Sequence, residues 1–162
     1  MAASAATTPP VLRRAAPADL DAIMDLETST FGSEAWSRAS MRAELASRHG
    51  YYLVAEQHAD FPLVGYAGLL APAGSGQADI QTIAVAPEAR GHGLGRSLMV
   101  ALLAEASARA ATEVFLEVRA DNPNAQALYS SLGFEQIAVR PQYYQPDGVD
   151  AHIMRLDLGE QS

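Results

Sequence analysis

A glycine-rich turn lies between an apolar run and an apolar helical pattern near the middle of the chain. Gly91, Gly93 and Gly95 fall within the stretch RGHGLGRSLM, residues 90–99. Without side chains in the way, backbone N–H groups of such a turn can approach an anion, and the N-terminus of the following helix adds a partial positive charge. The spacing therefore predicts a binding site for a phosphate or diphosphate group.

Two common phosphate-binding motifs do not fit this turn. The P-loop needs Gly-Lys followed by Ser or Thr, whereas Gly95 is followed by Arg96 and Ser97. The dinucleotide fingerprint would need a glycine at position 96 and an acidic residue about twenty positions further on. Neither cofactor class is supported, and the simplest alternative is a flexible glycine turn that begins an ordinary helix.

Glu117 is a second candidate, because it interrupts the apolar strand-like run VFLEV, residues 114–118. Burying a lone carboxylate costs several kcal/mol unless something compensates for the lost hydration. By strand alternation Glu117 shares a face with Phe115 and Arg119, so it could face a cleft and accept a proton there. The alternative is a structural glutamate that pairs with Arg119 or lies at a sheet edge.

Hydrophobic periodicity predicts the elements that must position these residues. Their order is strand, two helices, three strands, helix, strand, helix and two strands, and short links between the three central strands favour antiparallel pairing. The expected strands cover 11–15, 51–57, 63–71, 78–86, 112–120, 134–139 and 150–158. The expected helices begin at Pro17, after a Ser37 cap until Gly50, at Leu94 until about Ala111, and at 124–133 with Gly133 as the stop.

Length and composition bound the kind of protein. A chain of 162 residues with 49% hydrophobic residues predicts one domain over 11–158, preceded by a disordered tail at 1–10. No run of about 18 apolar residues and no charged, apolar leader are visible, which favours a soluble, cytoplasmic protein without a membrane segment. The oligomeric state is not predicted.

Charge and residue usage exclude several chemistries. The absence of cysteine removes disulfides, thiolate zinc sites and a cysteine nucleophile, and the four dispersed histidines predict no metal site. A serine nucleophile elbow is also missing. The net charge of −8, with eleven scattered arginines as the cations, argues against binding to nucleic acid.

Three longer segments carry a resemblance that covers roughly 11–156 and is tight from Asp79 to Tyr144. These are IQTIAVAPEARGHGLGRSLM, FLEVRADNPNAQALYSSLGF and RPQYYQPDGVDAHIMRL. The sequence resembles the GNAT superfamily of acetyl-CoA dependent N-acetyltransferases, and within it the RimI-type branch, which acetylates the N-terminal alanine of a small-subunit ribosomal protein. The resemblance implies an α/β (α+β) fold, with a mixed, mostly antiparallel sheet of about six or seven strands and about four helices, splayed at the cofactor site.

The resemblance also implies a role for each matched position. Acetyl-CoA would be held by residues of the central strand, the glycine turn and the loop before the last helix, namely Ile83, Ala84, Val85, Arg90, Gly91, His92, Gly93, Leu94, Gly95, Arg96 and Asn122. Glu117 would be the general base, acting directly or through water, and Tyr129 the acid that protonates the leaving thiolate.

Each of these roles has a structural alternative. Tyr129 could be a core residue with its hydroxyl at the surface, and Asn122 could cap a helix. Arg90 and Arg96 could be solvated cations at a helix end, and His92 would offer only its backbone. Two departures from the family pattern stand out: TFGSEAWSRAS replaces a Phe-Pro-Trp-Ser pattern, and Gly91 replaces a residue that is commonly basic or polar.

The sequence thus predicts a protein N-terminal acetyltransferase that works by direct transfer in a ternary complex. An α-amine has a reference pKa of about 7.7–8.0, against about 10.4 for lysine, so it is the easier amine to deprotonate. The expected partner is the N-terminal peptide of a ribosomal protein. Two alternatives remain open: an enzyme that acetylates a small amine or a lysine, and a non-catalytic acetyl-CoA sensor.

Overall fold

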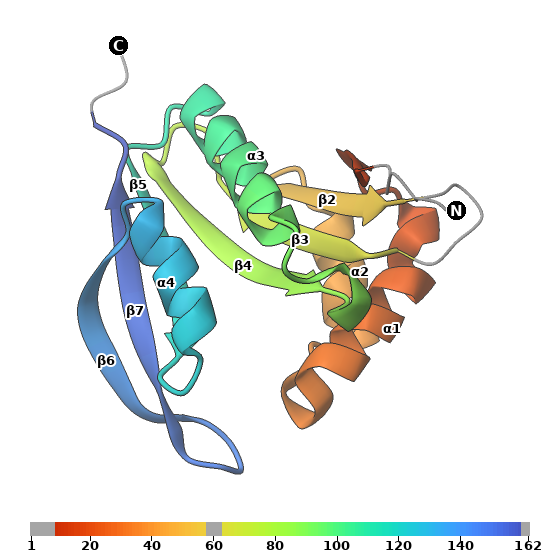
Figure 1. Ribbon diagram of the computed structural model, residues 1–162. Helices are drawn as coiled ribbons and strands as arrows, with labels where there is room; N and C mark the ends of the chain where they lie inside the picture. The colour runs from red at the N-terminus through yellow and green to blue at the C-terminus, as the bar shows by residue number, and fades with distance from the viewer. Residues whose placement is uncertain (1–8, 58–62, 160–162) are drawn as a thin grey trace, which may run out of the picture.

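A single twisted sheet organises the part of the chain described by the computed structural model, residues 9–57 and 63–159 (Figure 1). Its strand order is β1-β2-β3-β4-β5-β7-β6, and every neighbouring pair is antiparallel except β4 and β5, which are parallel. The strands are β1 (Val11–Arg14), β2 (Gly50–Glu56), β3 (Gly65–Leu70), β4 (Gln77–Val85), β5 (Glu113–Arg119), β6 (Glu135–Tyr144) and β7 (Val149–Asp157). The predicted element order and the mixed, mostly antiparallel sheet are confirmed.

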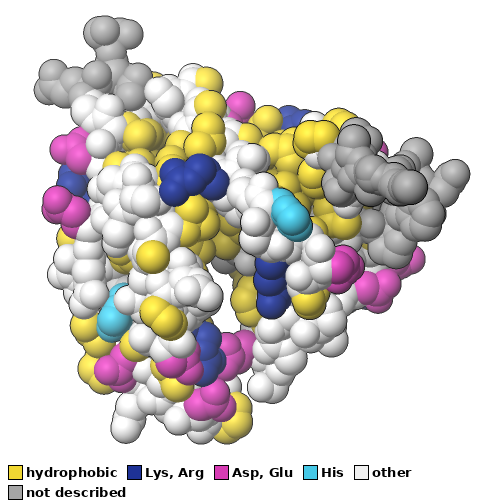
Figure 2. Space-filling view, viewed as in Figure 1, with side chains coloured by type: hydrophobic (Ala, Val, Ile, Leu, Met, Phe, Trp, Pro, Cys, Tyr) yellow, Lys and Arg dark blue, Asp and Glu magenta, His cyan; other side chains and the backbone are white. Residues whose placement is uncertain are grey.

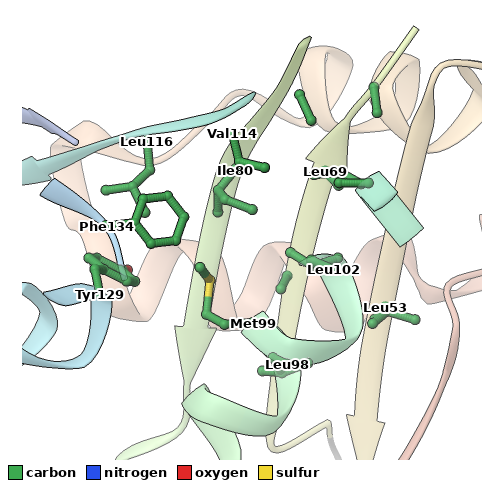
Figure 3. Packing of buried hydrophobic residues seen from close by; sticks show 14 of the residues in the cluster. Leu53, Leu69, Ile80, Leu98, Met99, Leu102, Val114, Leu116, Tyr129 and Phe134 are labelled. Carbon is green, nitrogen blue, oxygen red and sulfur yellow. The ribbon is translucent and has the colours of Figure 1, made fainter. Parts of the chain in front are cut away.

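Helices cover both faces of this sheet. The helices α1 (Leu20–Phe31) and α2 (Arg38–Ala46) pack on one face, and α3 (Leu94–Ala108) and α4 (Pro123–Ser131) pack on the other. The α3 face is formed by apolar residues at helical spacing, which pack against β2, β3 and β4. Figure 3 shows this core, where Leu98, Met99 and Leu102 meet side chains from the strands.

Some helix ends lie where the capping residues of the sequence predict them, and others do not. The Ser37 hydroxyl accepts a hydrogen bond from the Ser40 N–H at 3.1 Å, so the predicted cap of α2 is confirmed. Gly133 follows α4 with a φ of 103°, a conformation that glycine adopts readily. Gly50, however, does not end α2: the helix stops at Ala46, and Gly50 begins β2.

Three other boundaries also differ from the prediction. Pro17 begins a short 3-10 turn rather than α1 itself, and α3 ends at Ala108 because Ala110 takes a positive φ of 64°. The late strand expected over 134–139 continues to Tyr144, since register shifts in its pairing with β7 let it bend and keep pairing. Residues 1–8 of the predicted tail lie outside the described residues, as does the link 58–62.

The parallel pair is the feature that creates a site. β4 and β5 pair only over Gln77–Asp79 and Glu113–Phe115, after which the two strands separate. Figure 1 shows this divergence, with α4 and β5 on one side of the opening and β4 and α1 on the other. The predicted splay of the sheet is confirmed.

Candidate active site

The separated edge of β4 carries the first predicted group of residues. Ile83, Ala84 and Val85 pair with β3 on one side, and among the described residues they have no strand partner on the β5 side. Ala84 is buried, and Ile83 and Val85 are half-buried. A strand edge of this kind offers backbone N–H and C=O groups to an extended ligand, in the way that sheets accept an added strand.

The glycine turn lies directly beyond this edge. Gly91 and Gly93 have φ values of 83° and 81°, and Gly93 is the N-cap of α3 without any side-chain cap. Within the described part of the chain, the N–H groups from Gly91 to Arg96 have no hydrogen-bond acceptor, while the Ser97 N–H already donates to the Gly93 carbonyl. The turn therefore presents a run of free N–H groups at a helix N-terminus, which is what an anion requires.

Gly95 differs from the other two glycines. It lies inside α3, and a Cβ there would come 3.5 Å from Leu128 Cδ2, which is an ordinary van der Waals contact. Neither backbone conformation nor packing requires a glycine at this position, whereas close approach of a ligand to the helix would. The neighbouring Leu94 side chain is buried in the core, so only its backbone can face a ligand.

The charged side chains of the turn are exposed but partly engaged. Arg90 Nε donates to the Val85 carbonyl at 3.0 Å, and Arg96 donates to the Ser131 hydroxyl of α4. His92 is exposed and lines a separate cavity on the β1 side of the turn. Both arginines thus lie beside the free N–H groups, with the rest of each guanidinium group available for an anion.

Four predicted residues meet in one small cavity of about 200 Å³ inside the opening between β4 and β5. Ile83, Glu117, Asn122 and Tyr129 all line it. Asn122 caps α4, since its side-chain oxygen accepts a hydrogen bond from the Ala125 N–H at 3.2 Å. The cap expected as an alternative is therefore present, and it leaves Asn122 at the cavity wall.

Tyr129 is buried in the wall of this cavity, with 7% of its surface exposed. Its ring packs edge-on against Phe134 with a centroid separation of 6.1 Å, as the close view of the core shows (Figure 3). Burial raises the pKa of Tyr129 to about 12. The phenol therefore keeps its proton at neutral pH and can donate it to a strong base within the cavity.

Glu117 occupies the boundary between this cavity and a larger one. Its side chain is 35% exposed, so it lies at the opening rather than buried within the apolar run of β5. The structural alternative, an ion pair with Arg119, is not observed, and the nearby cation is Arg140, whose Nε lies 3.7 Å from Glu117 Oε2. An accessible carboxylate that touches both cavities can exchange a proton with a ligand in either.

The larger cavity, of about 860 Å³, lies on the α1 and α2 side of the sheet. In the space-filling view the surface is hollowed below α3, between the part with α4 and the part with α1 (Figure 2). Acidic and aromatic side chains from four elements face this cavity, among them Glu34, Trp36, Asp79, Phe115, Glu117, Tyr143 and Tyr144. Burial and the nearby charge of Glu117 both raise the pKa of Asp79, so Asp79 holds a proton more readily than an exposed aspartate, and the cation Arg140 lines the same cavity.

Most residues of this second cavity were not assigned a role from the sequence. Trp36 and the segment around Tyr144 belong to larger sequence patterns, and no pattern assigns a role to Asp79 or Glu34. Strand alternation alone could have placed Asp79 beside Glu117, since Asp79 pairs with Phe115 in the parallel register. Among the described residues, no cluster of three possible metal ligands occurs and no helix is long and apolar enough to cross a membrane.

The fold and its opening define a class of protein with established members. Residues 20–134 match the model of the acetyltransferase (GNAT) family. The chain therefore belongs to the acetyltransferase (GNAT) family, and it is an N-acetyltransferase.

Relatives within the family are more specific. The chain is 38% identical over 162 residues to the N-alpha-acetyltransferase RimI of Mycobacterium tuberculosis, covering 98% of this chain and 99% of that protein. It is 43% identical over 152 residues to an uncharacterized protein of Mycobacterium leprae, of which it spans only 41%. The crystal structure of the ribosomal-protein-S18-alanine N-acetyltransferase from Escherichia coli superposes with a TM-score of 0.82 at 28% identity, covering 94% of this chain and 96% of that one.

Proposed function

We propose that this protein transfers the acetyl group of acetyl-CoA to the N-terminal α-amine of a protein, in the manner of a RimI-type enzyme. The observation that carries the proposal is the meeting of two cavities at Glu117. One cavity leads past Tyr129 to the open edge of β4, and the other is an acidic groove open to solvent. A thioester and an amine that enter from opposite sides can meet only where these cavities join.

The residues of the turn fit the cofactor. Free N–H groups from Gly91 to Arg96 would hold the diphosphate, with Arg90 and Arg96 adding charge beside it. The backbone of Ile83, Ala84 and Val85 would pair with the pantetheine arm. Acetyl-CoA supplies the activated acetyl group when it is bound.

Glu117 would then accept the proton of the substrate ammonium group, directly or through water. The neutral amine forms a bond to the acetyl carbon, the carbon–sulfur bond breaks, and Tyr129 gives its phenolic proton to the departing thiolate. Because burial raises the pKa of Tyr129 to about 12, the phenol is a weaker acid than the thiol that forms, so the step depends on a well-placed hydrogen bond to the sulfur as negative charge develops there. Asp79 has no ion pair among the described residues and would favour a cationic N-terminus in the groove, whereas Glu34 and Glu117 already lie beside Arg119 and Arg140.

We further propose that the physiological substrate is the N-terminal alanine of a small-subunit ribosomal protein, met in the cytoplasm. The Mycobacterium tuberculosis relative is named an N-alpha-acetyltransferase, which supports an α-amine, and the Escherichia coli structure is named a ribosomal-protein-S18-alanine N-acetyltransferase, which supports alanine. The carboxylates of the groove suit the basic proteins of the ribosome.

The test is acetyl transfer to two matched peptides, followed by thiol release and by mass spectrometry. One peptide begins with a free alanine and lacks lysine, and the other has a blocked N-terminus and one internal lysine. We expect one acetyl group on the first peptide and none on the second. Acetylation of the second peptide alone would favour a lysine or small-amine enzyme, and cofactor binding without any turnover would favour a sensor.

A further inference from the structure

A buried carboxylate to which the proposed reaction assigns no role lies in the wall of the small cavity, next to the acidic groove. Glu27 of α1 is 1% exposed, and no ion pair with it occurs among the described residues. Burial raises the pKa of Glu27. An unpaired buried carboxylate is costly, so its two hydrogen bonds must compensate for the lost hydration.

Those two hydrogen bonds join different parts of the site. Glu27 Oε2 accepts the backbone N–H of Trp36 at 2.9 Å, and Glu27 Oε1 accepts the hydroxyl of Thr82 at 3.3 Å. Thr82 lies on β4 directly before Ile83, where the strand edge opens. Trp36 belongs to the α1–α2 connection (residues 32–37), which forms one wall of the acidic groove. Glu27 thus links the strand proposed for the cofactor to the wall proposed for the acceptor.

A second contact holds the same connection from the other side. Arg119, at the end of β5, forms an ion pair with Glu34, and it also pairs with Asp147 in the β6–β7 turn at 2.9 Å. Its guanidinium group stacks over the Tyr144 ring at 5.1 Å. Glu34 and Tyr144 both line the groove, so Arg119 ties its two opposite walls together.

We propose that Glu27 and Arg119 are positioning residues that fix the α1–α2 connection to the sheet and so set the width of the acceptor groove. This inference rests on the proposed function for the meaning of the groove, but the contacts themselves can be tested without any substrate. Both side chains line the small cavity, but the proposal gives them no contact with the reacting atoms, since each acts through the wall that it holds.

Trp36 makes the test direct, because it is the sole tryptophan of the chain. Its emission spectrum and its quenching by acrylamide report on the α1–α2 connection alone. We expect Glu27→Leu and Arg119→Gln to shift the emission to the red and to increase quenching. Glu27→Gln keeps an oxygen acceptor for the Trp36 N–H and should restore the spectrum of the parent protein.

The KM values for the two substrates distinguish a positioning role from a general loss of structure. In Glu27→Leu and Arg119→Gln the KM for the alanine peptide should rise about tenfold, while the KM for acetyl-CoA changes by less than about twofold. The matched controls are Asp25→Leu, which removes an exposed carboxylate of the same helix, and Arg42→Gln, which removes an exposed arginine of α2. Both controls should leave the Trp36 emission and both KM values unchanged.

The possible results divide cleanly. Unchanged Trp36 emission in both variants, or equal rises in the two KM values, would overturn the proposal. If Glu27→Leu does not fold, Glu27→Gln and the surface variant Arg119→Gln still decide the outcome. If the parent protein acetylates no N-terminal peptide, the proposed function is wrong. The fluorescence of Trp36 still tests whether Glu27 and Arg119 hold the α1–α2 connection in place.

Discussion

The glycine turn and the acidic groove achieve recognition in opposite ways. The turn is built from consecutive residues, Gly91 to Arg96, and presents backbone N–H groups with few side chains around them. The groove is built from side chains of four elements that are distant in the sequence, and ion pairs such as that of Arg119 hold its walls. The contrast indicates that a common cofactor can be held by backbone geometry, whereas the choice of acceptor depends on side chains that can vary.

The largest effect is expected from a change at Glu117, which should affect catalysis without affecting the binding of the cofactor by the turn. Glu117→Gln keeps the shape of the side chain but removes its capacity to take up a proton. We expect kcat to fall by about 10²–10⁴-fold with the affinity for acetyl-CoA unchanged. Steady-state kinetics and calorimetry measure the two effects. The matched control is Glu113→Gln on the same face of β5, where Glu113 pairs with Arg155 at 2.8 Å outside the groove; an equal loss there would contradict the assignment.

Substitutions in the glycine turn should have the reverse effect: they should lower the affinity for acetyl-CoA and leave kcat largely unchanged. Gly95→Ala is expected to weaken acetyl-CoA binding about tenfold, because the added Cβ blocks approach to the helix N-terminus. The same change should leave stability equal or raise it by up to about 1 kcal/mol, since alanine is the better helix former. Calorimetry and thermal unfolding give both values.

Gly93→Ala provides the matched comparison within the turn. Because Gly93 has a positive φ of 81°, an alanine there should lower the free energy of unfolding by about 1–2 kcal/mol, and it should also weaken the binding of acetyl-CoA. If Gly95→Ala bound acetyl-CoA as tightly as the parent protein, the turn would not be the diphosphate site.

The small cavity predicts a dependence of stability on alkaline pH. Burial raises the pKa of Tyr129 to about 12 in the folded protein, above the usual value of about 10 for the unfolded chain. Between these values the unfolded state loses its proton first, so the free energy of unfolding falls as pH rises from about 10 to about 12. Tyr52 and Tyr144 contribute in the same direction.

Tyr129→Phe removes one of these contributions and should flatten the alkaline fall in stability. Urea unfolding at several pH values measures it. An identical pH dependence in the variant and the parent protein would show that the Tyr129 hydroxyl is open to water.

Asp79 in the acidic groove should have a smaller effect on stability, and it should appear near neutral pH. Burial and the charge of Glu117 raise the pKa of Asp79, so its ionised form is unfavourable in the folded state. Asp79→Asn should therefore increase the free energy of unfolding at pH 7, by less than about 1 kcal/mol because the site is partly solvated. The gain should vanish as pH falls below about 4, where Asp79 is protonated in both states. A loss of stability at pH 7 would mean that Asp79 has a stabilising partner.

The same contrast explains what the sequence could predict. The glycine turn and the element order follow from local spacing and could be read from consecutive residues, whereas the splayed sheet is implied by the family resemblance. Glu117 and Tyr129 were brought to one cavity as expected. The length of β6, the partner of Glu117 and the roles of Glu34 and Asp79 depend on register shifts and on contacts between distant segments. No local pattern encodes those, because the pairing of β6 with β7 decides which side chains reach the groove.

The central claim is that the turn holds the cofactor so that its sulfur lies at the junction of the two cavities. A crystal structure of the protein with CoA and a peptide that begins with alanine tests it most directly. We predict the diphosphate on the N–H groups of Gly91 to Arg96, the sulfur within hydrogen-bond distance of the Tyr129 hydroxyl, and the peptide amine facing Glu117. A CoA molecule whose sulfur lies away from both side chains, or a peptide bound outside the acidic groove, would contradict the account.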